Sequence, residues 1–249
     1  MLQPSHEALF AALADVALAW QPRDVVGGDF YHFVAYADGW SFVLADCTGH
    51  GVPGAFMTLI ASSRLAHALE RIGPRDPARL LVELNRGVKS ALAQDEPHVA
   101  GGVASDDGLD ALVLWFEHAR AELTFASARV PLHLLARDAA EVRTIDGERM
   151  GLGYVGTPAS YAWTNRSVTL GDGDVVCAAT DGVVDQIGGS KHIAFGKRRL
   201  REAMVHARAR PMPEFAAALL AAHADYQAGH RRRDDLTLFC FRTARASVR

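Results

Sequence analysis

Four short segments each place an aspartate beside glycine or at the end of an apolar run, where its carboxylate could bind a metal ion. The aspartates are Asp29, Asp46, Asp181 and Asp234. Mg²⁺ and Mn²⁺ take oxygen ligands, and strand ends hold carboxylates rigidly. Two such ions lower the pKa of a bridging water and clamp phosphoryl oxygens, so no side-chain nucleophile is required. Any one of these aspartates alone is more typical of a turn, and the interpretation depends on the set.

The residues around the first two aspartates predict the elements that position them. Apolar runs predict strands over 30–35 and 40–45, with a turn at 38–39 between them. A helix is predicted from about Pro53, which suits a first helical turn. Its apolar side is expected to carry Ala55, Phe56, Leu59, Ile60 and Ala66.

The first twenty residues predict a separate helix. Leu9, Leu13 and Val16 recur at helical spacing, which favours a helix over 5–20. We expect residues 1–20 to be an N-terminal element and residues 21–243 to be one domain, since no linker composition divides the rest.

The remaining chain predicts helices in two groups around many short strands. Strands are predicted over 111–116, 122–126, 132–136, 142–145, 167–170, 175–179 and 236–242, and helices over 77–93, 197–209 and 213–227. Gly, Asp, Asn or Pro punctuates the short runs, as in an antiparallel meander. This order favours an α+β fold rather than repeated βαβ units.

Composition excludes several classes of function. The chain has 249 residues, 49% hydrophobic and 22% charged, with a net charge of −3. This balance gives no reason to expect a nucleic acid or a membrane surface as partner, and no apolar stretch is long enough to span a bilayer. The start lacks the features of a secretory signal. Three cysteines without metal-ligand spacing are simplest to explain in a reducing, cytoplasmic compartment.

Two other motifs have weaker interpretations. Residues 151–156 fit the pattern GxGxxG, but Pro158 and the residues after it deny the helix that a dinucleotide site needs, so a loop is expected. His50 lies between two glycines and could be a ligand or an acid. A structural hydrogen bond is the favoured role, because hard cations prefer oxygen.

The four segments together resemble the motifs of bacterial SpoIIE-like phosphatases, which belong to the PPM family related to protein phosphatase 2C. The motifs are GGDFY at 27–31, DCTGHGVPGA at 46–55, TDG at 180–182 and DDLT at 234–237. The similarity extends from about Asp15 to Phe241. The run DQIGG at 185–189, with FGKRR at 195–199, resembles the SiaA-like subgroup.

The resemblance implies an αββα sandwich of two mainly antiparallel sheets, with two Mn²⁺ or Mg²⁺ ions at one end. It implies that Asp46 bridges the ions, with Asp29 and the backbone carbonyl of Cys47 completing one coordination sphere. Asp181 and Asp234 would bind the other ion. Two further residues, Asp235 and His50, would support these ligands from behind.

The resemblance also implies a protein-serine/threonine phosphatase in a bacterial partner-switching pathway. Its partner would be a small phosphorylated regulatory protein, similar to an anti-sigma-factor antagonist or to the SiaA pathway's substrate, and the N-terminal helix could serve a homodimer or regulation. Arg23 could contact phosphate, although a solvent-exposed role is simpler. The basic loop before Asp234 could steer an acidic partner or be merely solvated; it consists of Arg231, Arg232 and Arg233.

Three departures from the family pattern bear on the site. His32 stands where an aspartate is common, and Cys47 replaces a usual glycine or methionine, which is tolerable if only its carbonyl binds metal. Residues 127–129 lack the aspartate that helps some relatives to bind a third ion, so a third site is not expected.

Two rival functions follow from the same residues. A pseudophosphatase would keep the fold without the chemistry, but the four aspartates argue against it. A dinuclear phosphodiesterase acting on nucleotides is disfavoured, because many such sites mix imidazole with carboxylate and these motifs contain almost no histidine.

Overall fold

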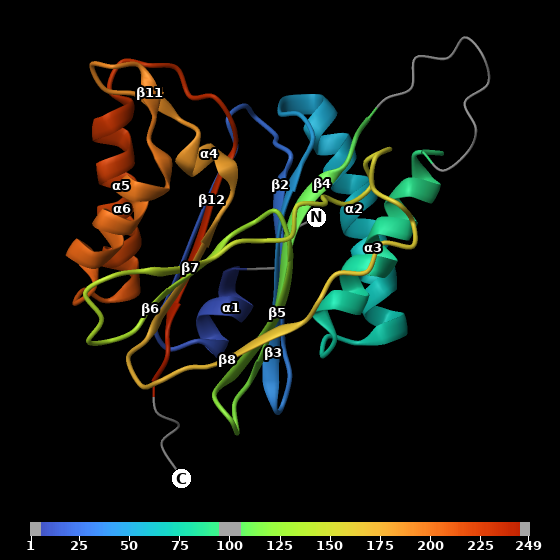
Figure 1. Ribbon diagram of the computed structural model, residues 1–249, viewed down its shortest axis with the longest axis horizontal. Coiled ribbons are helices and arrows are strands. Elements are labelled where there is room, and N and C mark those ends of the chain that lie inside the picture. The colour runs from blue at the N-terminus through green and yellow to red at the C-terminus, as the bar shows by residue number, and fades with distance from the viewer. Residues whose placement is uncertain (1–5, 95–105, 245–249) are drawn as a thin grey trace.

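The computed structural model describes residues 6–94 and 106–244. Two five-stranded sheets pack face to face, and helices cover both outer faces (Figure 1). One sheet has the order β2-β3-β4-β5-β8, formed by β2 (Asp29–Ala35), β3 (Gly39–Cys47), β4 (Leu109–Glu117), β5 (Glu122–Ala128) and β8 (Arg166–Thr169). The other has the order β1-β12-β9-β6-β7, formed by β1 (Val16–Gln21), β12 (Leu236–Arg242), β9 (Val175–Ala179), β6 (Leu132–Leu135) and β7 (Arg143–Ile145).

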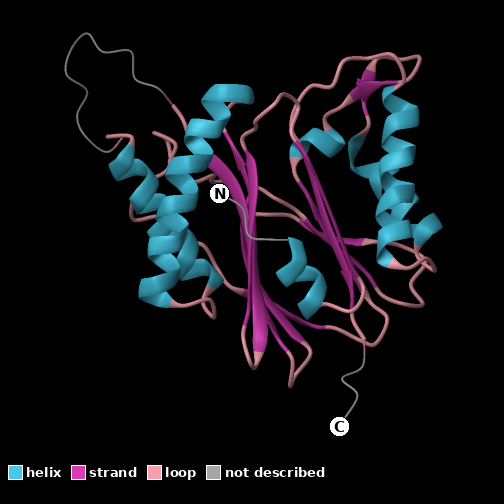
Figure 2. Ribbon diagram, turned by 180° about the vertical axis from the view of Figure 1, so that it is seen from behind, coloured by secondary structure: helices cyan, strands magenta, loops and turns pink. Residues whose placement is uncertain are grey.

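The helices form the two outer layers. Helices α2 (Gly51–Ile72) and α3 (Pro77–Ala91) cover the sheet that contains β3, and α5 (Gly196–Ala207) and α6 (Met212–Gln227) cover the sheet that contains β12 (Figure 2). Three shorter elements are α4 (Asp181–Val184), β10 (Ile187–Gly188) and β11 (Ile193–Ala194). This arrangement confirms the predicted α+β, αββα sandwich, and all strand pairs between named strands are antiparallel.

Alternation along the strands divides the core into three layers. On β3, Phe42 and Leu44 face the other sheet, whereas Val43 and Ala45 face α2 and α3. Because successive side chains on a strand point to opposite faces, this parity fixes where the polar residues of the same strands point. Asp46 therefore lies on the side of Leu44, between the two sheets.

The N-terminal prediction is wrong beyond Ala12. Helix α1 spans only His6–Ala12, and β1 follows it and pairs with β12. A short apolar run fits either a helix or a strand, and here the unpaired edge of β12 decides in favour of a strand. The boundary predicted between residues 20 and 21 therefore cuts through a strand of the sandwich. Leu9 of α1 is buried with the inter-sheet core.

The apolar side predicted for α2 is also wrong. Its buried residues are Gly54, Met57, Thr58, Ala61, Leu65 and Ala68. Phe56 and Leu59 are instead exposed, at 63% and 41%. The choice between the two apolar stripes depends on how the helix rotates against β2 and β3, which its own sequence does not specify.

The other predicted elements agree with the structure to within a few residues, whereas α4, β10 and β11 were not predicted. Residues 151–156 form a loop without a helix, as expected. In the described ranges, no helix is both long enough and apolar enough to cross a membrane.

Candidate active site

Three aspartates form a row across one end of the sheet that contains β3. Asp29 on β2 lies directly opposite Asp46 on β3, and Asp46 lies directly opposite Asp110 on β4. Residues in register on adjacent strands share a face, with Cβ atoms about 4.5–5.5 Å apart. The row therefore faces the other sheet, at the end of the layer that Phe42 and Leu44 fill further along.

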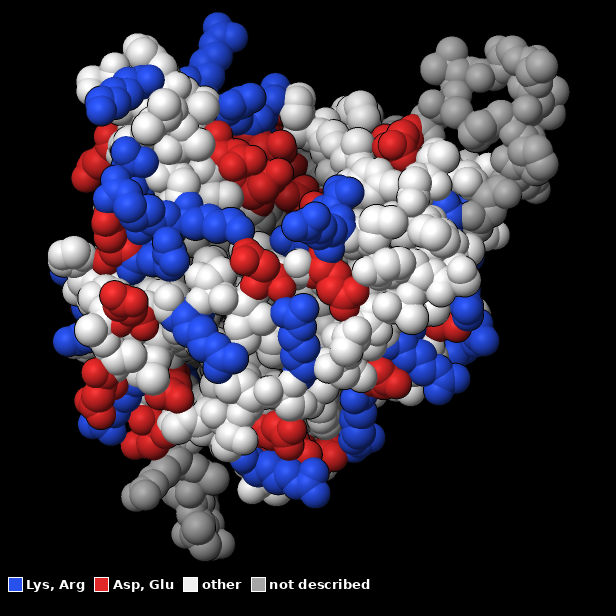
Figure 3. Space-filling view, viewed as in Figure 1, with Lys and Arg blue, Asp and Glu red and all other residues white. Residues whose placement is uncertain are grey.

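The other two predicted ligands come from the facing sheet. Asp181 is the first residue of α4, directly after β9, and Asp234 precedes β12. Burial, followed by the nearby charge of Asp234, raises the pKa of Asp181 to about 6. Figure 3 shows acidic side chains gathered at this end between the two halves, with basic side chains beside them. The structure thus brings all four sequence-predicted aspartates together.

The clustered aspartates repel one another, because too little positive charge balances them. Burial raises the pKa of Asp46 well above its ordinary value, and the charges of Asp29, Asp181, Asp234 and Asp110 raise it further. Burial likewise raises the pKa of Asp29 to about 7 and that of Asp110 to about 6. Carboxylates in such an environment favour a bound cation, because its positive charge offsets their mutual repulsion.

Two threonines hold Asp29 from the opposite sheet. Thr180, after β9, donates its hydroxyl to Asp29 Oδ2 at 2.7 Å, and Thr237 on β12 donates to the same oxygen at 2.6 Å. The two threonines are themselves linked, since Thr237 N donates to Thr180 Oγ1 at 3.0 Å. One carboxylate oxygen of Asp29 is thereby fixed across the sandwich, and its orientation depends on both sheets.

Asp235 ties the loop before Asp29 to the other sheet. Its carboxylate accepts hydrogen bonds from the backbone nitrogens of Arg23, at 2.6 Å, and Gly28, at 2.5 Å. The carbonyl oxygen of Gly28 accepts two further hydrogen bonds, from Thr58 Oγ1 at 2.9 Å and from Cys47 N at 3.2 Å. Asp235 therefore lies behind the site and orients the segment that carries Asp29.

The glycine before Asp29 is required by close packing. A Cβ on Gly28 would lie 2.5 Å from Gly49 O and 2.8 Å from Cys47 O. The loops that carry Asp29 and Asp46 can therefore approach one another only if residue 28 has no side chain.

The other residues of the second motif have separate roles. The Cys47 side chain is buried on the face toward α2, away from the aspartates, and burial raises the pKa of its thiol well above the ordinary value. A neutral, buried thiol is no nucleophile. His50, at the N-terminus of α2, lies with Nδ1 3.2 Å from Asp24 Oδ2. This contact agrees with a structural hydrogen bond.

The four arginines selected from the sequence differ in their surroundings. Arg23 donates from Nη1 to Arg233 O at 3.1 Å, so its side chain bridges two loops beside the site. Arg231 and Arg233 are exposed, whereas Arg232 is half-buried and donates from Nε to Asp234 O at 3.2 Å. Arg232 therefore braces the loop that carries Asp234, and only its two neighbours face solvent.

Sequence reasoning missed Asp110 and Arg129. Residues 127–129 lack an aspartate, as noted, but Arg129 extends toward the adjacent strand and lies with Nη1 3.4 Å from Asp110 Oδ1. A signal for Asp110 was present, since it directly precedes a predicted strand, as Asp29 does. The pairing that brings it opposite Asp46 joins residues far apart in the sequence and has no local signature.

The clustered carboxylates are chemically suited to divalent cations. All five clustered side chains offer carboxylate oxygens, which suit Mg²⁺ and Mn²⁺. Across the part of the chain that the structure describes, however, no three His, Cys, Asp or Glu side chains converge as they would around a bound ion. Because Mg²⁺ keeps several waters and takes only one or two carboxylates, the aspartates still fit as its ligands.

Comparison with known proteins identifies the family. The family model described as "Stage II sporulation protein E (SpoIIE)" matches residues 36–244. The SiaA-PP2C domain of Pseudomonas aeruginosa is 36% identical, with 97% of this chain and 91% of that chain covered and a TM-score of 0.85. A search of curated proteins found no match.

Two more distant structures share the fold. The RsbU and RsbW domains of Rv1364c from Mycobacterium tuberculosis align at 21% identity and TM-score 0.71, over 93% of this chain and 60% of that one. The phosphatase domain of SpoIIE from Bacillus subtilis, with a fragment of its regulatory domain, aligns at 18% identity and TM-score 0.71, over 94% of this chain and 64% of that one.

The chain belongs to the SpoIIE family of PP2C-type protein-serine/threonine phosphatases. The resemblance to this family and to SiaA is confirmed.

Proposed function

We propose that the protein removes phosphate from phosphoserine or phosphothreonine on a small regulatory protein, using two Mn²⁺ or Mg²⁺ ions. The observation that carries this proposal is the meeting of Asp29 and Asp46 from one sheet with Asp181 and Asp234 from the other. PPM phosphatases use divalent metals, and RsbX, a structural neighbour, was crystallised with magnesium. A homodimer that involves the N-terminal segment stays a prediction.

The aspartates divide between two ions in this proposal. Asp46, central in the row, would bridge them, with Asp29 and the carbonyl of Cys47 on one ion. Asp181 and Asp234 would bind the other. When bound, the ions would supply an activated water and neutralise phosphoryl oxygens.

The protein contributes orientation. Thr180 and Thr237 hold one oxygen of Asp29, which leaves the other free to turn toward a cation. Asp235 fixes the backbone at Gly28, so the first metal-binding segment is positioned before any ion arrives. Preorganised ligands of this kind lower the cost of assembling the charged site.

Phosphate release from a purified protein phosphorylated on serine tests the proposal. We expect release that requires added Mn²⁺ or Mg²⁺, since oxygen ligands exchange these ions readily. Activity should disappear with EDTA and return with metal. Full activity after exhaustive dialysis against EDTA would contradict the metal-dependent mechanism.

A matched set of substrates separates the rivals. A nucleotide phosphodiester should be hydrolysed far more slowly than the phosphoprotein. Calorimetry with Mn²⁺ gives an independent readout: binding without turnover on any phosphoprotein would indicate a pseudophosphatase.

A further inference from the structure

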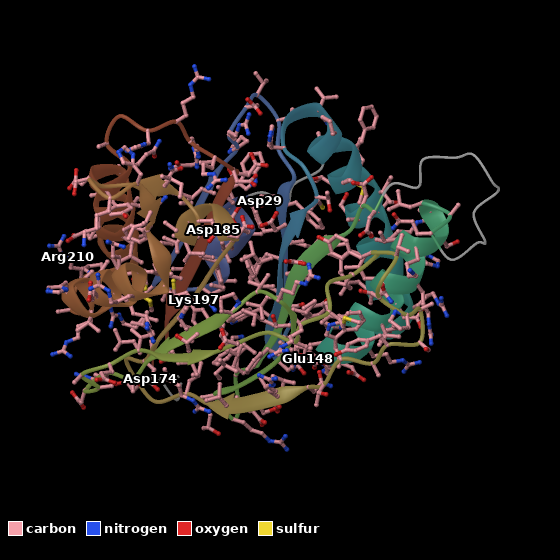
Figure 4. All side chains as sticks on the ribbon, turned by 45° about the horizontal axis from the view of Figure 1, so that its top comes forward. Asp29, Glu148, Asp174, Asp185, Lys197 and Arg210 are labelled. Carbon is pink, nitrogen blue, oxygen red and sulfur yellow. The ribbon has the colours of Figure 1, made fainter. Side chains whose placement is uncertain are left out.

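A hollow of about 210 Å³ opens beside the aspartate cluster. Asp46, Asp110 and Asp181 line it, and its wall also contains Arg129, Lys197 and His133. Figure 4 brings this end forward and labels two of the lining residues, with Asp185 close to Asp29 and Lys197 beyond it. The hollow thus joins predicted metal ligands to cationic side chains in one space.

Arg129 is held in place by its backbone and by its side chain. Its φ of +67° is in the left-handed region, which costs stability for a residue with a Cβ. Its backbone nitrogen donates to Glu148 O at 2.8 Å, and Nε donates to Arg149 O at 2.9 Å. The guanidinium carbon lies 4.9 Å from the ring centroid of Tyr154. A strained backbone conformation that several contacts hold in place is common at functional sites.

The Nη1 side of the guanidinium contacts one of the clustered aspartates. Nη1 lies 3.4 Å from Asp110 Oδ1, and Asp110 is directly opposite Asp46. The Arg129 side chain is 43% exposed, so it is accessible from solvent. Lys197 instead forms an ion pair outside the cluster, since its Nζ lies 2.8 Å from Asp146 Oδ1.

We propose that Arg129 binds the phosphoryl group of the substrate in this hollow. The planar fork of arginine matches two phosphoryl oxygens, and stacking on Tyr154 orders it beforehand. Asp110 acts as the positioning residue that keeps the fork beside Asp46. The inference rests on the proposed phosphatase function and assigns phosphate recognition within it to a residue outside the four motifs.

This assignment differs from the one based on Arg23. The Arg23 side chain donates to Arg233 O and lies, through Nε, 3.6 Å from Asp24, so its donors serve contacts between loops. Arg129 also uses two donors, Nε on Arg149 O and Nη1 on Asp110 Oδ1, but its second partner lines the hollow together with Asp46.

Substitution of Arg129 by Gln and by Lys tests the proposal. Arg137→Gln is the matched control: Arg137 also has Nη1 3.4 Å from an aspartate, Asp172, and its side chain is 64% exposed. Each protein is assayed with Mn²⁺ on a phosphopeptide and on p-nitrophenyl phosphate. Calorimetry separately measures the binding of Mn²⁺ alone and of inorganic phosphate to the Mn²⁺-loaded protein.

We expect Arg129→Gln to lower kcat/KM about 10²-fold on both substrates, because both share the phosphoryl group. The affinity for inorganic phosphate should fall at least about tenfold, and that for Mn²⁺ should stay within about twofold. Arg129→Lys should recover part of the loss, since it keeps the charge without the fork. Arg137→Gln should match the wild type.

Unchanged phosphate affinity in Arg129→Gln would overturn the proposal, as would a loss of Mn²⁺ affinity equal to the loss of activity. Circular dichroism checks folding, and the Lys variant keeps the test open if Gln fails to fold. The two proposals fail differently. A wild type without turnover would refute the phosphatase function, whereas phosphate calorimetry would still decide the role of Arg129.

Discussion

The two ends of the inter-sheet layer contain opposite chemistry on the same strands. Toward one end, Phe42 on β3 stacks on Phe239 on β12 with ring centroids 3.7 Å apart, and Trp40 meets Phe241 edge-on at 5.0 Å. Four residues further along β3 lies Asp46, within the carboxylate cluster. The same pair of sheets is therefore dry and aromatic in one part and highly charged in the other.

This difference separates the tasks of stability and function. Aromatic packing sets the distance and angle between the sheets, and that spacing brings Thr237 to Asp29. The aspartate end costs stability, because burial and mutual repulsion raise the pKa of its carboxyls. Active sites commonly carry such a cost, which the rest of the core offsets.

The largest effect should come from the charged end. Asp46→Asn should lower kcat by about 10³-fold or more, equivalent to at least about 4 kcal/mol, because it removes the proposed bridging ligand. The metal-free protein should be as stable as the wild type or more stable, since a repelling charge is gone. Steady-state kinetics and denaturant unfolding in EDTA measure the two effects.

The exposed Asp138 offers a matched control, because Asp138→Asn removes the same charge far from the cluster. It should change neither property. Retention of more than about a tenth of wild-type kcat by Asp46→Asn, a loss below about 1.4 kcal/mol, would refute the ligand assignment.

The aromatic end should respond in the opposite sense. Phe239→Ala should lower the free energy of unfolding by about 3–5 kcal/mol, because a fully buried ring leaves a cavity between the sheets. The fraction that remains folded should keep most of its kcat. Phe10→Ala, at a site 48% exposed, should cost under about 1 kcal/mol. Equal losses in both variants would show that the inter-sheet stack does not hold the sandwich together.

A smaller effect is expected at Asp235, which lies behind the aspartate cluster. Asp235→Asn should cost about 2–3 kcal/mol of stability, because an amide cannot accept from both Arg23 N and Gly28 N as the carboxylate does. It should also lower kcat severalfold, since Gly28 precedes Asp29. Thermal unfolding and initial rates measure the two quantities.

Asp174 provides the control for this geometry. Its carboxylate also accepts from two backbone nitrogens, those of Arg137 at 3.0 Å and Gly171 at 2.7 Å, but at a distant turn (Figure 4). Asp174→Asn should lower stability and leave kcat unchanged. A fall in kcat of equal size in both variants would remove the special role of Asp235 in the site.

Local sequence signals were enough for most of the sandwich. Apolar runs such as 40–45 became strands because both faces of the strand meet an apolar layer. Residues 16–20 were misassigned as helix, because only the distant β12 selects a strand there. The exposed face of α2, with Phe56, escaped prediction for the same reason: the helix has two apolar stripes and tertiary packing chooses one.

The site shows the same division. Asp29 and Asp46 stood out by their glycine neighbours, which the close approach at Gly28 explains. The threonine pair on Asp29 and the register of Asp110 depend on contacts between residues more than sixty positions apart. Such contacts leave no spacing pattern in a single sequence.

The smallest expected effect concerns the rim of the charged end, where Arg231 and Arg233 are exposed. Arg231→Gln/Arg233→Gln should raise KM for a phosphoprotein about three- to tenfold and weaken its dependence on salt, because rim charges steer encounter rather than chemistry. Arg232 is kept, since it braces Asp234. Hydrolysis of p-nitrophenyl phosphate should change less than about twofold.

The variant Arg71→Gln/Arg120→Gln removes two exposed charges from elsewhere and should behave as the wild type. A parallel fall in kcat on both substrates would place the loop within the catalytic site, and the division between a docking rim and a charged interior would then fail.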